Sequence, residues 1–487
     1  MNKTIRRSAV FCLLMVLALL GRATYVQFYQ GQALADDKLN RRNTIARYAN
    51  PLGDIIVAGS PVTGSVRTTG GDLAYKRAYR NGELYAAVTG FSSQVYGATQ
   101  LEGIYGTVLD GTDTRMKGPL SVLTGERARG GDVLTTIDPA VQKAGYAALG
   151  GKKGAAVAID PRTGRILGMV STPSYDPSKI AGSADGAAWK ALSEDPDKPM
   201  VNRALRQPLP PGSTFKLVVA AAALENGLYP SVDTRTDSPS PYTLPGTRTV
   251  LTNENPSAPC ENATIRTALQ YSCNNVFAKL ADRLGQDRVR AMAEKFGFND
   301  AEQDVPVRAS ASVYPKASAN MDRAQTALTG IGQFEVTATP LQMAMVSAAI
   351  ANDGVMASPH MVSQVTDAEG TTLQSYADGD GKRIVSSQTA RQLRSAMVTV
   401  VEEGTGSNAK VSGAEVGGKT GTAQHGVGNS KTPYAWFTSY AKDHATGKQV
   451  AVAVLIEDSG AARSEVSGNG LAAPVAPKMM GAALRAS

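Results

Sequence analysis

Residues 208–227 read PLPPGSTFKLVVAAAALENG. The prolines and the glycine just before Ser213 cannot extend a helix backwards, and serine is a preferred N-cap. The segment therefore predicts a helix over Thr214–Glu225 that ends near Gly227. Its residues are apolar nearly all round, which is typical of a helix buried in a core. We expect this helix to lie inside a folded domain, with Ser213 held rigidly at its start.

The spacing of Ser213 and Lys216 points to chemistry. Residues three apart on a helix share one face, so the Lys216 amine would lie close enough to take the proton of the Ser213 hydroxyl. The same S-x-x-K pattern begins at Ser407 and at Ser439, but without a proline-glycine stop and a long apolar helix. An ordinary helix cap is the structural alternative for Ser213. Further motifs have to decide between the two.

A second motif, S-x-N, is formed by Ser272 and Asn274 at the start of another predicted helix with an apolar face. The pattern also begins at Ser318 and at Ser467. Only Ser272 combines a position between the S-x-x-K motif and the last predicted strands with a strongly apolar helix after it. A helix N-cap is again the structural alternative.

A third motif, K-T-G, occurs once, at Lys419-Thr420-Gly421, and Thr422 follows it on the same predicted strand. A lysine and two hydroxyl groups on a strand edge form a rim that can bind an anion. Gly421 leaves the backbone bare, so that a substrate could approach closely. A solvated lysine followed by a tight strand is the alternative.

The composition narrows the class of protein. The chain has 487 residues with a hydrophobic fraction of 42%, which is typical of two or three globular domains. Its net charge of +8 is spread out, without a run of five basic residues, so it favours an anionic envelope over nucleic acid. The three histidines are scattered, and neither a G-x-S-x-G nor an H-E-x-x-H pattern occurs. We therefore predict no metal site and no cofactor.

The N-terminus reads as a membrane anchor. Three basic residues precede the apolar run 8–21, and Arg22 could snorkel to the far interface so that the span reaches the required length of about 20 residues. A cleaved signal peptide is the alternative, but the cleavage-like residues 33–35 lie far beyond the apolar run. We expect residues 1–30 to form a cytoplasmic tip and one transmembrane helix in the cell membrane, with the remaining chain outside the cell.

The cysteines are consistent with this placement. Cys12 falls in the anchor, whereas Cys260 and Cys273 lie in the part expected in an oxidising space. They could form a disulfide, or they could be two lone thiols in a core, and the sequence leaves both possibilities open.

The remaining chain divides into two predicted domains. Residues 31–150 are polar and rich in glycine, with short strand-like pieces, and we interpret them as an irregular α+β module of a pedestal or dimerisation type. Residues 151–487 begin with a hairpin, continue with helices and end with strands, which predicts one antiparallel sheet whose first strands pair with its last. The fold class is thus α/β of the α+β type, with helices flanking the sheet. The last strands are predicted at Ala414–Gln424, Tyr434–Tyr440 and Gln449–Glu457.

In chain order, S-x-x-K at Ser213, S-x-N at Ser272 and K-T-G at Lys419 form the motif set of penicillin-binding proteins and class A β-lactamases. The chain resembles the class B penicillin-binding proteins, the bitopic peptidoglycan transpeptidases, and most closely an actinobacterial PbpA-like branch. The resemblance covers nearly the whole length, including the anchor and the segments 101–105, 136–138, 202–204 and 339–342.

This resemblance implies a D,D-transpeptidase that cross-links peptidoglycan stem peptides through an acyl-Ser213 intermediate and releases D-alanine. Lys216 would be the general base, because burial and a second cation, Lys419, both lower the pKa of its amine. Ser272 would relay the proton to the leaving amine, and Asn274 would hold the peptide carbonyl of the substrate.

The resemblance also assigns the K-T-G strand. Lys419 would supply the electrostatic field, and Thr420 and Thr422 would hold the terminal carboxylate of the donor peptide, with Gly421 between them. The oxyanion hole would be formed by the backbone N–H groups of Ser213 and Thr422.

Three alternatives share part of this chemistry. A class A β-lactamase needs an E-x-x-N loop between Ser272 and Lys419, and this chain has none. A D,D-carboxypeptidase would share the motifs, but the large module before residue 151 and the anchor favour a class B enzyme. A receptor that β-lactams acylate would need further transmembrane spans and a cytoplasmic effector domain.

The resemblance implies partners as well. We expect peptidoglycan stem peptides as substrates, β-lactam antibiotics as inhibitors, and a polytopic membrane glycosyltransferase bound through the anchor and the N-terminal module. The region before residue 150 is too short to hold a glycosyltransferase domain as well. No nucleic acid is expected as a partner.

Overall fold

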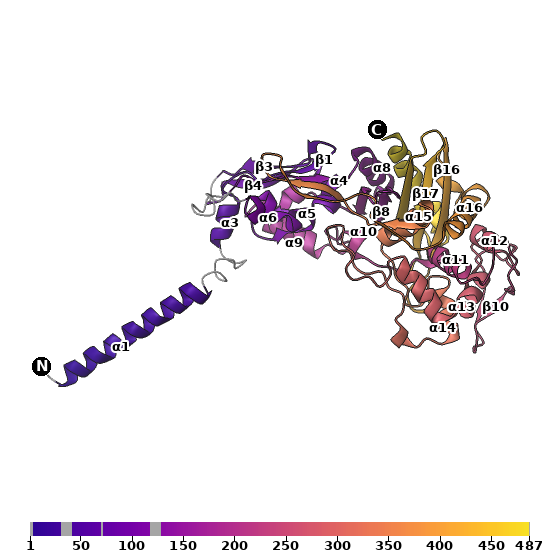
Figure 1. The fold of residues 1–487 in the computed structure, drawn as a ribbon, viewed down its shortest axis with the longest axis horizontal. Helices are drawn as coiled ribbons and strands as arrows, with labels where there is room; N and C mark the ends of the chain where they lie inside the picture. Colours follow the sequence, from indigo (N-terminus) through magenta and orange to yellow (C-terminus); the bar gives the residue numbers. More distant parts are fainter. Residues whose placement is uncertain (1–2, 31–40, 70–71, 117–127, 487) are drawn as a thin grey trace.

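The computed structural model describes residues 3–30, 41–69, 72–116 and 128–486 (Figure 1). Helix α1 (Lys3–Tyr25), extended by the π-turn η1 (Val26–Gln30), points away from the rest of the chain and has no buried residue. Among the described residues, this is the one helix long and apolar enough to cross a membrane. It lies where the sequence predicts the anchor.

The main sheet has five antiparallel strands in the order β16-β17-β18-β8-β9. Strand β18 pairs with β8, so that Val454 lies opposite Ala156. The first strands of the domain therefore pair with its last strands, and the predicted antiparallel sheet is confirmed. The strands are β8 (Lys153–Ile159), β9 (Ile166–Thr172), β16 (Ala414–Ala423), β17 (Tyr434–Asp443) and β18 (Gln449–Asp458).

Both faces of this sheet are buried, and alternate residues of each strand point to different layers. Ala155 and Val157 of β8 belong to the larger core, whereas Ala156 and Ala158 belong to a second one. The second core lies under α8 (Pro139–Leu149) and α17 (Ala476–Arg485). Such strands read as nearly continuous apolar runs because neither face meets water.

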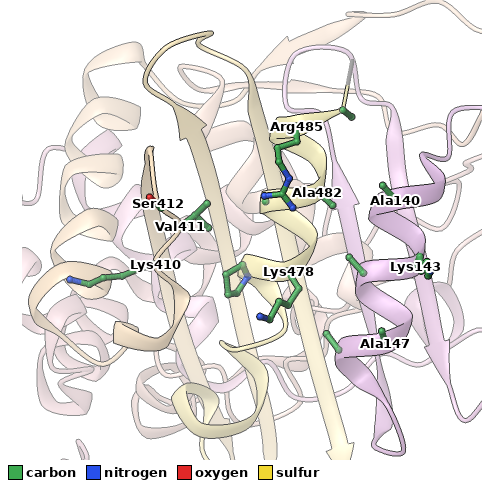
Figure 2. Close-up of a pocket in the computed structure, with 14 residues that line it drawn as sticks. Ala140, Lys143, Ala147, Lys410, Val411, Ser412, Lys478, Ala482 and Arg485 are labelled. Carbon is green, nitrogen blue, oxygen red and sulfur yellow. The ribbon is translucent and has the colours of Figure 1, made fainter.

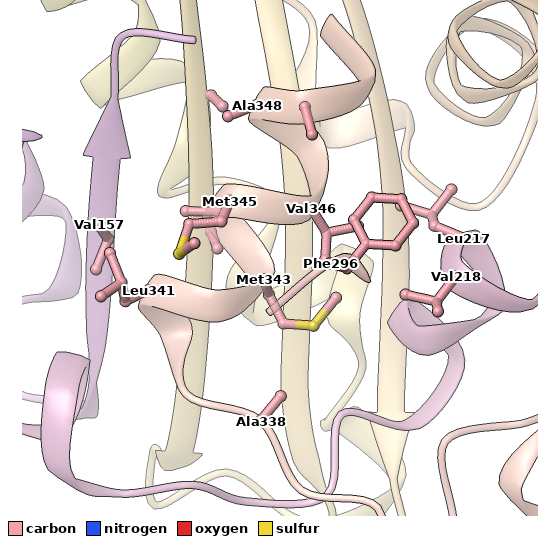
Figure 3. Close-up of a cluster of buried hydrophobic side chains, with 14 of the residues drawn as sticks. Val157, Leu217, Val218, Phe296, Ala338, Leu341, Met343, Met345, Val346 and Ala348 are labelled. Atoms are coloured by element: carbon pink, nitrogen blue, oxygen red, sulfur yellow. The ribbon is translucent and has the colours of Figure 1, made fainter. Parts of the chain in front are cut away.

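The larger core surrounds α15 (Pro340–Ala351), every residue of which is buried. Figure 3 shows the side chains of α15 between β8 on one side and α11 (Lys216–Glu225) on the other. Helix α11 is buried from Lys216 to Ala223, as its apolar sequence predicts. Further helices of this layer are α10 (Arg203–Arg206), which packs against α15, and α12 (Ile265–Gln270), α13 (Asn274–Lys295), α14 (Arg323–Thr329) and α16 (Ser387–Glu403).

The start of the central helix differs from its prediction. Residues Gly212–Phe215 form a 3-10 turn, η4, and α11 begins only at Lys216. Gly212 has a φ of 52°, a conformation that favours glycine, and Ser213 makes no side-chain capping bond. The prediction of Ser213 as a helix N-cap was therefore wrong. Its hydroxyl caps no helix.

A second five-stranded sheet joins distant parts of the chain, in the order β14-β13-β7-β1-β2. Strands β1 (Ile55–Val57), β2 (Ser60–Pro61) and β7 (Val133–Thr135) come from the N-terminal region, whereas β13 (Val362–Thr366) and β14 (Thr372–Ser375) follow α15. The hydroxyls of Tyr105 and Tyr376 lie 2.6 Å apart and form a hydrogen bond across this junction. No local pattern in the sequence indicates this shared sheet.

The rest of the N-terminal region is small and mixed. It contains α3 (Arg41–Arg47), the hairpin β3 (Thr63–Arg67) and β4 (Tyr75–Tyr79), and helices α4 (Gly82–Thr89), α5 (Gln100–Ile104) and α6 (Gly106–Leu109). Its centre is a fully buried ion pair, with Arg77 Nε 2.6 Å from Glu102 Oε1. Because a buried charge must be paired, this contact fixes β4 against α5.

Candidate active site

The turn that carries Ser213 packs directly against the K-T-G strand. A Cβ atom on Gly421 would lie 2.9 Å from the carbonyl oxygen of Pro211 and 3.1 Å from a side-chain carbon of Thr214. Glycine is therefore required at position 421 for the serine turn to approach β16. The backbone N–H of Gly212 donates to the carbonyl of Gly332 at 3.1 Å, which fixes the other side of the turn.

Lys216 lies one turn further along, at the first residue of α11, and is fully buried. Its amine contacts the S-x-N motif: Nζ is 2.7 Å from the carbonyl oxygen of Ser272, 2.8 Å from Asn274 Oδ1 and 3.3 Å from Ser272 Oγ. Within the described structure, the Lys216 amine forms no hydrogen bond with the Ser213 hydroxyl. The amine is thus oriented by the second motif.

Ser272 links the two lysines. Its hydroxyl accepts a hydrogen bond from Lys419 Nζ at 3.0 Å and lies 3.3 Å from Lys216 Nζ. Its backbone has a φ of 59°, a left-handed conformation that is uncommon for residues other than glycine. Such strain persists only where the surrounding structure imposes it, and it is frequent at functional sites. The strained backbone places the hydroxyl between the two amines.

Ser272 is not the N-cap of its helix. Helix α13 begins at Asn274, and its first two backbone N–H groups, those of Asn274 and Asn275, donate to the Asn253 side-chain oxygen at 2.6 and 3.3 Å. The cap comes from a residue 21 positions upstream of the helix. The Ser272 hydroxyl therefore stays available to the lysines.

Cys260 and Cys273 form a disulfide in the structure. Cys273, the middle residue of the S-x-N motif, is bonded to Cys260, with the two Cα atoms 5.5 Å apart. The bridge fastens the motif to the loop that precedes α12. Free Cys12 lies on α1.

Lys419 completes the cationic centre. It is fully buried on β16, and its Nζ donates to Ser272 Oγ and to the carbonyl oxygen of Thr420, both at 3.0 Å. Burial lowers the pKa of the Lys419 amine to about 7. Burial, and then the nearby charge of Lys419, lower the pKa of the Lys216 amine well below its ordinary range. The negative charge of Glu254 opposes both changes.

Strand β16 lies at the edge of the main sheet, so alternate backbone groups of this strand are not used in pairing with β17. Thr420 is buried, and its hydroxyl shares a hydrogen bond with that of Thr405 at 2.9 Å. Thr422 is half-buried near the end of the strand. A Cβ on Gly212 would meet the carbonyl oxygen of Thr422 at 3.2 Å, so the end of the K-T-G strand borders the serine turn.

The structure therefore brings every predicted site residue to one place, where the start of α11, the start of α13 and the edge of β16 meet. Three further residues lie there that no motif in the sequence indicates: Asn253, Glu254 and Thr405. The first two have no local signal, because they lie in a loop: Asn253 caps a helix that begins 21 residues later, and the charge of Glu254 acts on lysines of other elements. The signal of Thr405 is equally weak, since it is one polar residue in the loop after α16.

A separate groove of about 900 Å³ lies between α8 and α17 (Figure 2). Alanines line its floor, and Lys143, Lys410, Lys478 and Arg485 surround it. It contains none of the predicted site residues, and α8 and α17 cover the opposite face of the sheet from α11. It is therefore not the active site.

Two protein-family models match the chain. Residues 154–481 match the transpeptidase domain of penicillin-binding proteins, and residues 52–133 match the dimerisation domain of penicillin-binding protein A. The chain is 37% identical to the peptidoglycan D,D-transpeptidase PbpA of Mycolicibacterium smegmatis and 36% identical to that of Mycobacterium tuberculosis. Both alignments cover 100% of this chain and 99% of the relative.

Solved structures agree with these sequences. Penicillin-binding protein A from M. tuberculosis, in its ceftriaxone acyl-enzyme complex, superposes with a TM-score of 0.82 at 36% identity, covering 91% of this chain and 100% of that one. Its penicillin G acyl-enzyme complex gives a TM-score of 0.79 at 37% identity, covering 90% and 100% of the two chains.

Proposed function

Since the chain belongs to the class B penicillin-binding proteins and is a peptidoglycan D,D-transpeptidase that binds penicillin, we propose that Ser213 is the nucleophile that becomes acylated. The observation that carries this assignment is the pair of buried lysines, Lys216 and Lys419, joined through Ser272 beside the serine turn. Among the described serines that start an S-x-x-K pattern, Ser213 alone is followed by a lysine in this centre.

Lys216 is the general base of acylation. A neutral lysine has two N–H groups and one lone pair. The carbonyl of Ser272 and Asn274 Oδ1 can only accept hydrogen bonds, so they occupy both N–H groups. The lone pair then remains free to accept a proton from a hydroxyl. Because burial and the charge of Lys419 favour the neutral amine, Lys216 can take the Ser213 proton near neutral pH.

Acylation then proceeds in two proton transfers. Ser213 Oγ attacks the carbonyl of the penultimate D-alanine as its proton passes to Lys216. The bond to the terminal D-alanine breaks, and its amine receives the proton through the Ser272 hydroxyl, which lies within 3.3 Å of both lysines. Asn274 uses one amide N–H on the carbonyl of Thr252, which leaves the second for a carbonyl of the substrate.

The K-T-G strand binds the negatively charged groups of the substrate. The hydroxyls of Thr420 and Thr422 hold the terminal carboxylate of the donor in the electrostatic field of the Lys419 ammonium, and Gly421 lets the strand meet the serine turn. The backbone N–H groups of Ser213 and Thr422 form the oxyanion hole. The unpaired edge of β16 and its contact with the turn support this arrangement.

The test is acylation of the full-length protein in detergent by a fluorescent penicillin, followed over time by intact mass, for wild type and Ser213→Ala. A long-lived adduct that the variant lacks is expected. Rapid turnover without an adduct would point to a β-lactamase, and an adduct that persists in Ser213→Ala would refute the nucleophile. Release of D-alanine without cross-linked product, with acceptor present, would indicate a D,D-carboxypeptidase.

We further propose the division into an anchor at 1–30, an N-terminal module at 31–150 and a transpeptidase domain at 151–487, with the N-terminus in the cytoplasm. The family matches at 52–133 and 154–481 and the apolar helix α1 support this division. The basic residues before the apolar run support the orientation. Alkaline phosphatase fused after the last residue should be active in cells, and a fusion at the N-terminus should not.

A polytopic membrane glycosyltransferase is the proposed partner, bound through α1 and the N-terminal module. Such an enzyme supplies the glycan strands that carry the stem peptides. Co-purification from detergent extracts should succeed with the full chain and fail when α1 is replaced by an unrelated transmembrane helix, while penicillin acylation continues.

A further inference from the structure

A short loop crosses the start of α13 beside the two lysines. Asn253 accepts the backbone N–H groups of Asn274 and Asn275, and Asn274 Nδ2 donates to the carbonyl of Thr252 at 3.0 Å. Asn274 Oδ1 in turn contacts Lys216 Nζ at 2.8 Å. The loop backbone is therefore separated from the Lys216 amine by a single side chain.

Glu254 is the next residue of this loop, and it is exposed to solvent. In the described part of the chain, it is the one carboxylate whose charge raises the pKa of both Lys216 and Lys419. Glu457, which lies near the same end of the sheet, has only 8% of its side chain exposed and is paired with Arg203 at 3.2 Å. Glu254 therefore supplies the exposed negative charge at an otherwise cationic centre.

The mechanism above does not use this charge. Acylation needs a neutral Lys216, and a carboxylate that raises the pKa of the Lys216 amine works against that requirement. The donor peptide also carries a carboxylate, which Glu254 would repel. Glu254 thus opposes both the deprotonation of Lys216 and the binding of the donor carboxylate. We therefore look for its role in the second half of the reaction, in which the acyl group is transferred to an amine.

The acceptor of that half-reaction enters as a cation. A primary alkylamine has a pKa close to that of lysine, about 10.4, so near neutral pH it is an ammonium ion that a charged Lys419 repels. A carboxylate at the rim of the site offsets this repulsion and raises the local concentration of the ammonium ion. We propose that Glu254 forms the acceptor subsite of this active site and binds a primary ammonium group.

The inference rests on the proposed acyl-Ser213 chemistry and extends it. The bound ammonium ion loses one proton to water, and its nitrogen attacks the acyl carbonyl. A C–N bond forms and the bond from the carbonyl carbon to Ser213 Oγ breaks. The second proton of the nitrogen passes to the neutral Lys216 amine and from there to Ser213 Oγ, which restores the resting hydroxyl.

The experiment measures how one acyl-enzyme is shared between two acceptors. Full-length protein in detergent is acylated with a thioester of an N-acyl-D-alanine donor in the presence of Nα-acetyl-lysinamide, whose ε-amine is charged, or of hydroxylamine, which is uncharged at the same pH. Each aminolysis product is compared with the hydrolysis product. These ratios describe events after acylation, so they do not depend on how a variant changes the acylation rate.

Glu254→Gln should lower the preference for the charged amine over the uncharged one by about 5-fold, the effect expected of one solvent-exposed charge. Glu261→Gln removes another exposed carboxylate from the same region, which acts on neither lysine, and should keep the wild-type preference. Added salt should reduce the preference of the wild type toward that of Glu254→Gln.

An unchanged preference in Glu254→Gln, or an equal change in both variants, would overturn the acceptor subsite while leaving the acyl-enzyme chemistry in place. A wild-type protein that forms no Ser213-dependent acyl-enzyme from the thioester would overturn the proposed nucleophile and the subsite together.

Discussion

Replacing Lys419 by methionine should stabilise the protein while it removes activity. The Lys419 side chain is fully buried, and burial lowers the pKa of its amine to about 7. The unfolded chain exposes this amine to water, where its pKa returns to about 10.4. Near neutral pH, the folded protein therefore carries a cost for holding a group that the unfolded state accommodates better as a cation.

The size of this cost follows from the two pKa values. The interval of about 3.4 pH units corresponds to about 5 kcal/mol, reduced to about 4 kcal/mol at pH 7, where half of the folded molecules are already neutral. Methionine has a similar length and no charge. The substitution removes the hydrogen bonds to Ser272 Oγ and to the Thr420 carbonyl, which stabilise the folded state by about 1 kcal/mol each. The net gain is about 2 kcal/mol, or about 2 °C in Tm for a chain of this length.

The pH dependence distinguishes this explanation from better packing by methionine. Because the folded-state pKa is lowered, the cost of Lys419 is complete below pH 7 and disappears as the pH rises toward 10.4. At pH 9 it has fallen to about 2 kcal/mol, which equals the loss of the two hydrogen bonds. The wild type and Lys419→Met should therefore have the same Tm near pH 9.

The assay is thermal unfolding of the full-length protein in detergent between pH 6 and 9. Lys410→Met serves as the control, because Lys410 is half-exposed and its pairing with Glu402 is a surface contact of small energy. It should change the Tm by less than 1 °C at any pH. A Lys419→Met protein that melts below the wild type at pH 7, or a difference that stays constant with pH, would refute the reasoning.

Three further predictions concern the same centre. Asn253→Ala removes the oxygen that caps α13, so the free energy of unfolding should fall by about 2 kcal/mol in urea and penicillin acylation should slow; an unchanged midpoint would contradict this. Cys273→Ser opens the loop closed by its bridge to Cys260, 13 residues away, and should cost about 3 kcal/mol, as should reduction of the wild type; the loop explanation fails if only the substitution has an effect. The acylation rate should rise with pH as Lys216 becomes neutral and decline above about pH 7 as Lys419 loses its proton, which a rate still rising at pH 10 would disprove.

Local patterns in the sequence predicted the helix after Ser213 and the long strands near the end of the chain. The apolar run after Ser213 predicted a buried helix, and the structure has one there, α11. The three long strands near the end of the chain were predicted within about three residues because both their faces are apolar. Signals of this kind lie within the element that they describe.

The features that the sequence did not predict depend on contacts between distant segments. The cap of α13 comes from Asn253, and the second sheet unites β7 with β13, which lies more than 220 residues further along. Hydrophobic periodicity describes one element at a time, so it cannot show which distant segment completes a sheet edge or a helix end. Tertiary contacts alone determine both features.

The chemistry of the motifs nevertheless restricts the tertiary structure more than their spacing does. A lysine can act as a base at neutral pH only if burial or another cation lowers the pKa of its amine, and a second buried lysine is tolerated only if shared acceptors satisfy both amines. The Ser272 hydroxyl meets this requirement because its backbone is held at a φ of 59°, a conformation that no helix cap would need. The interpretation of Ser272 as a helix cap is therefore wrong, because Asn253 accepts the first backbone N–H groups of α13, and its role as a proton relay stays a proposal.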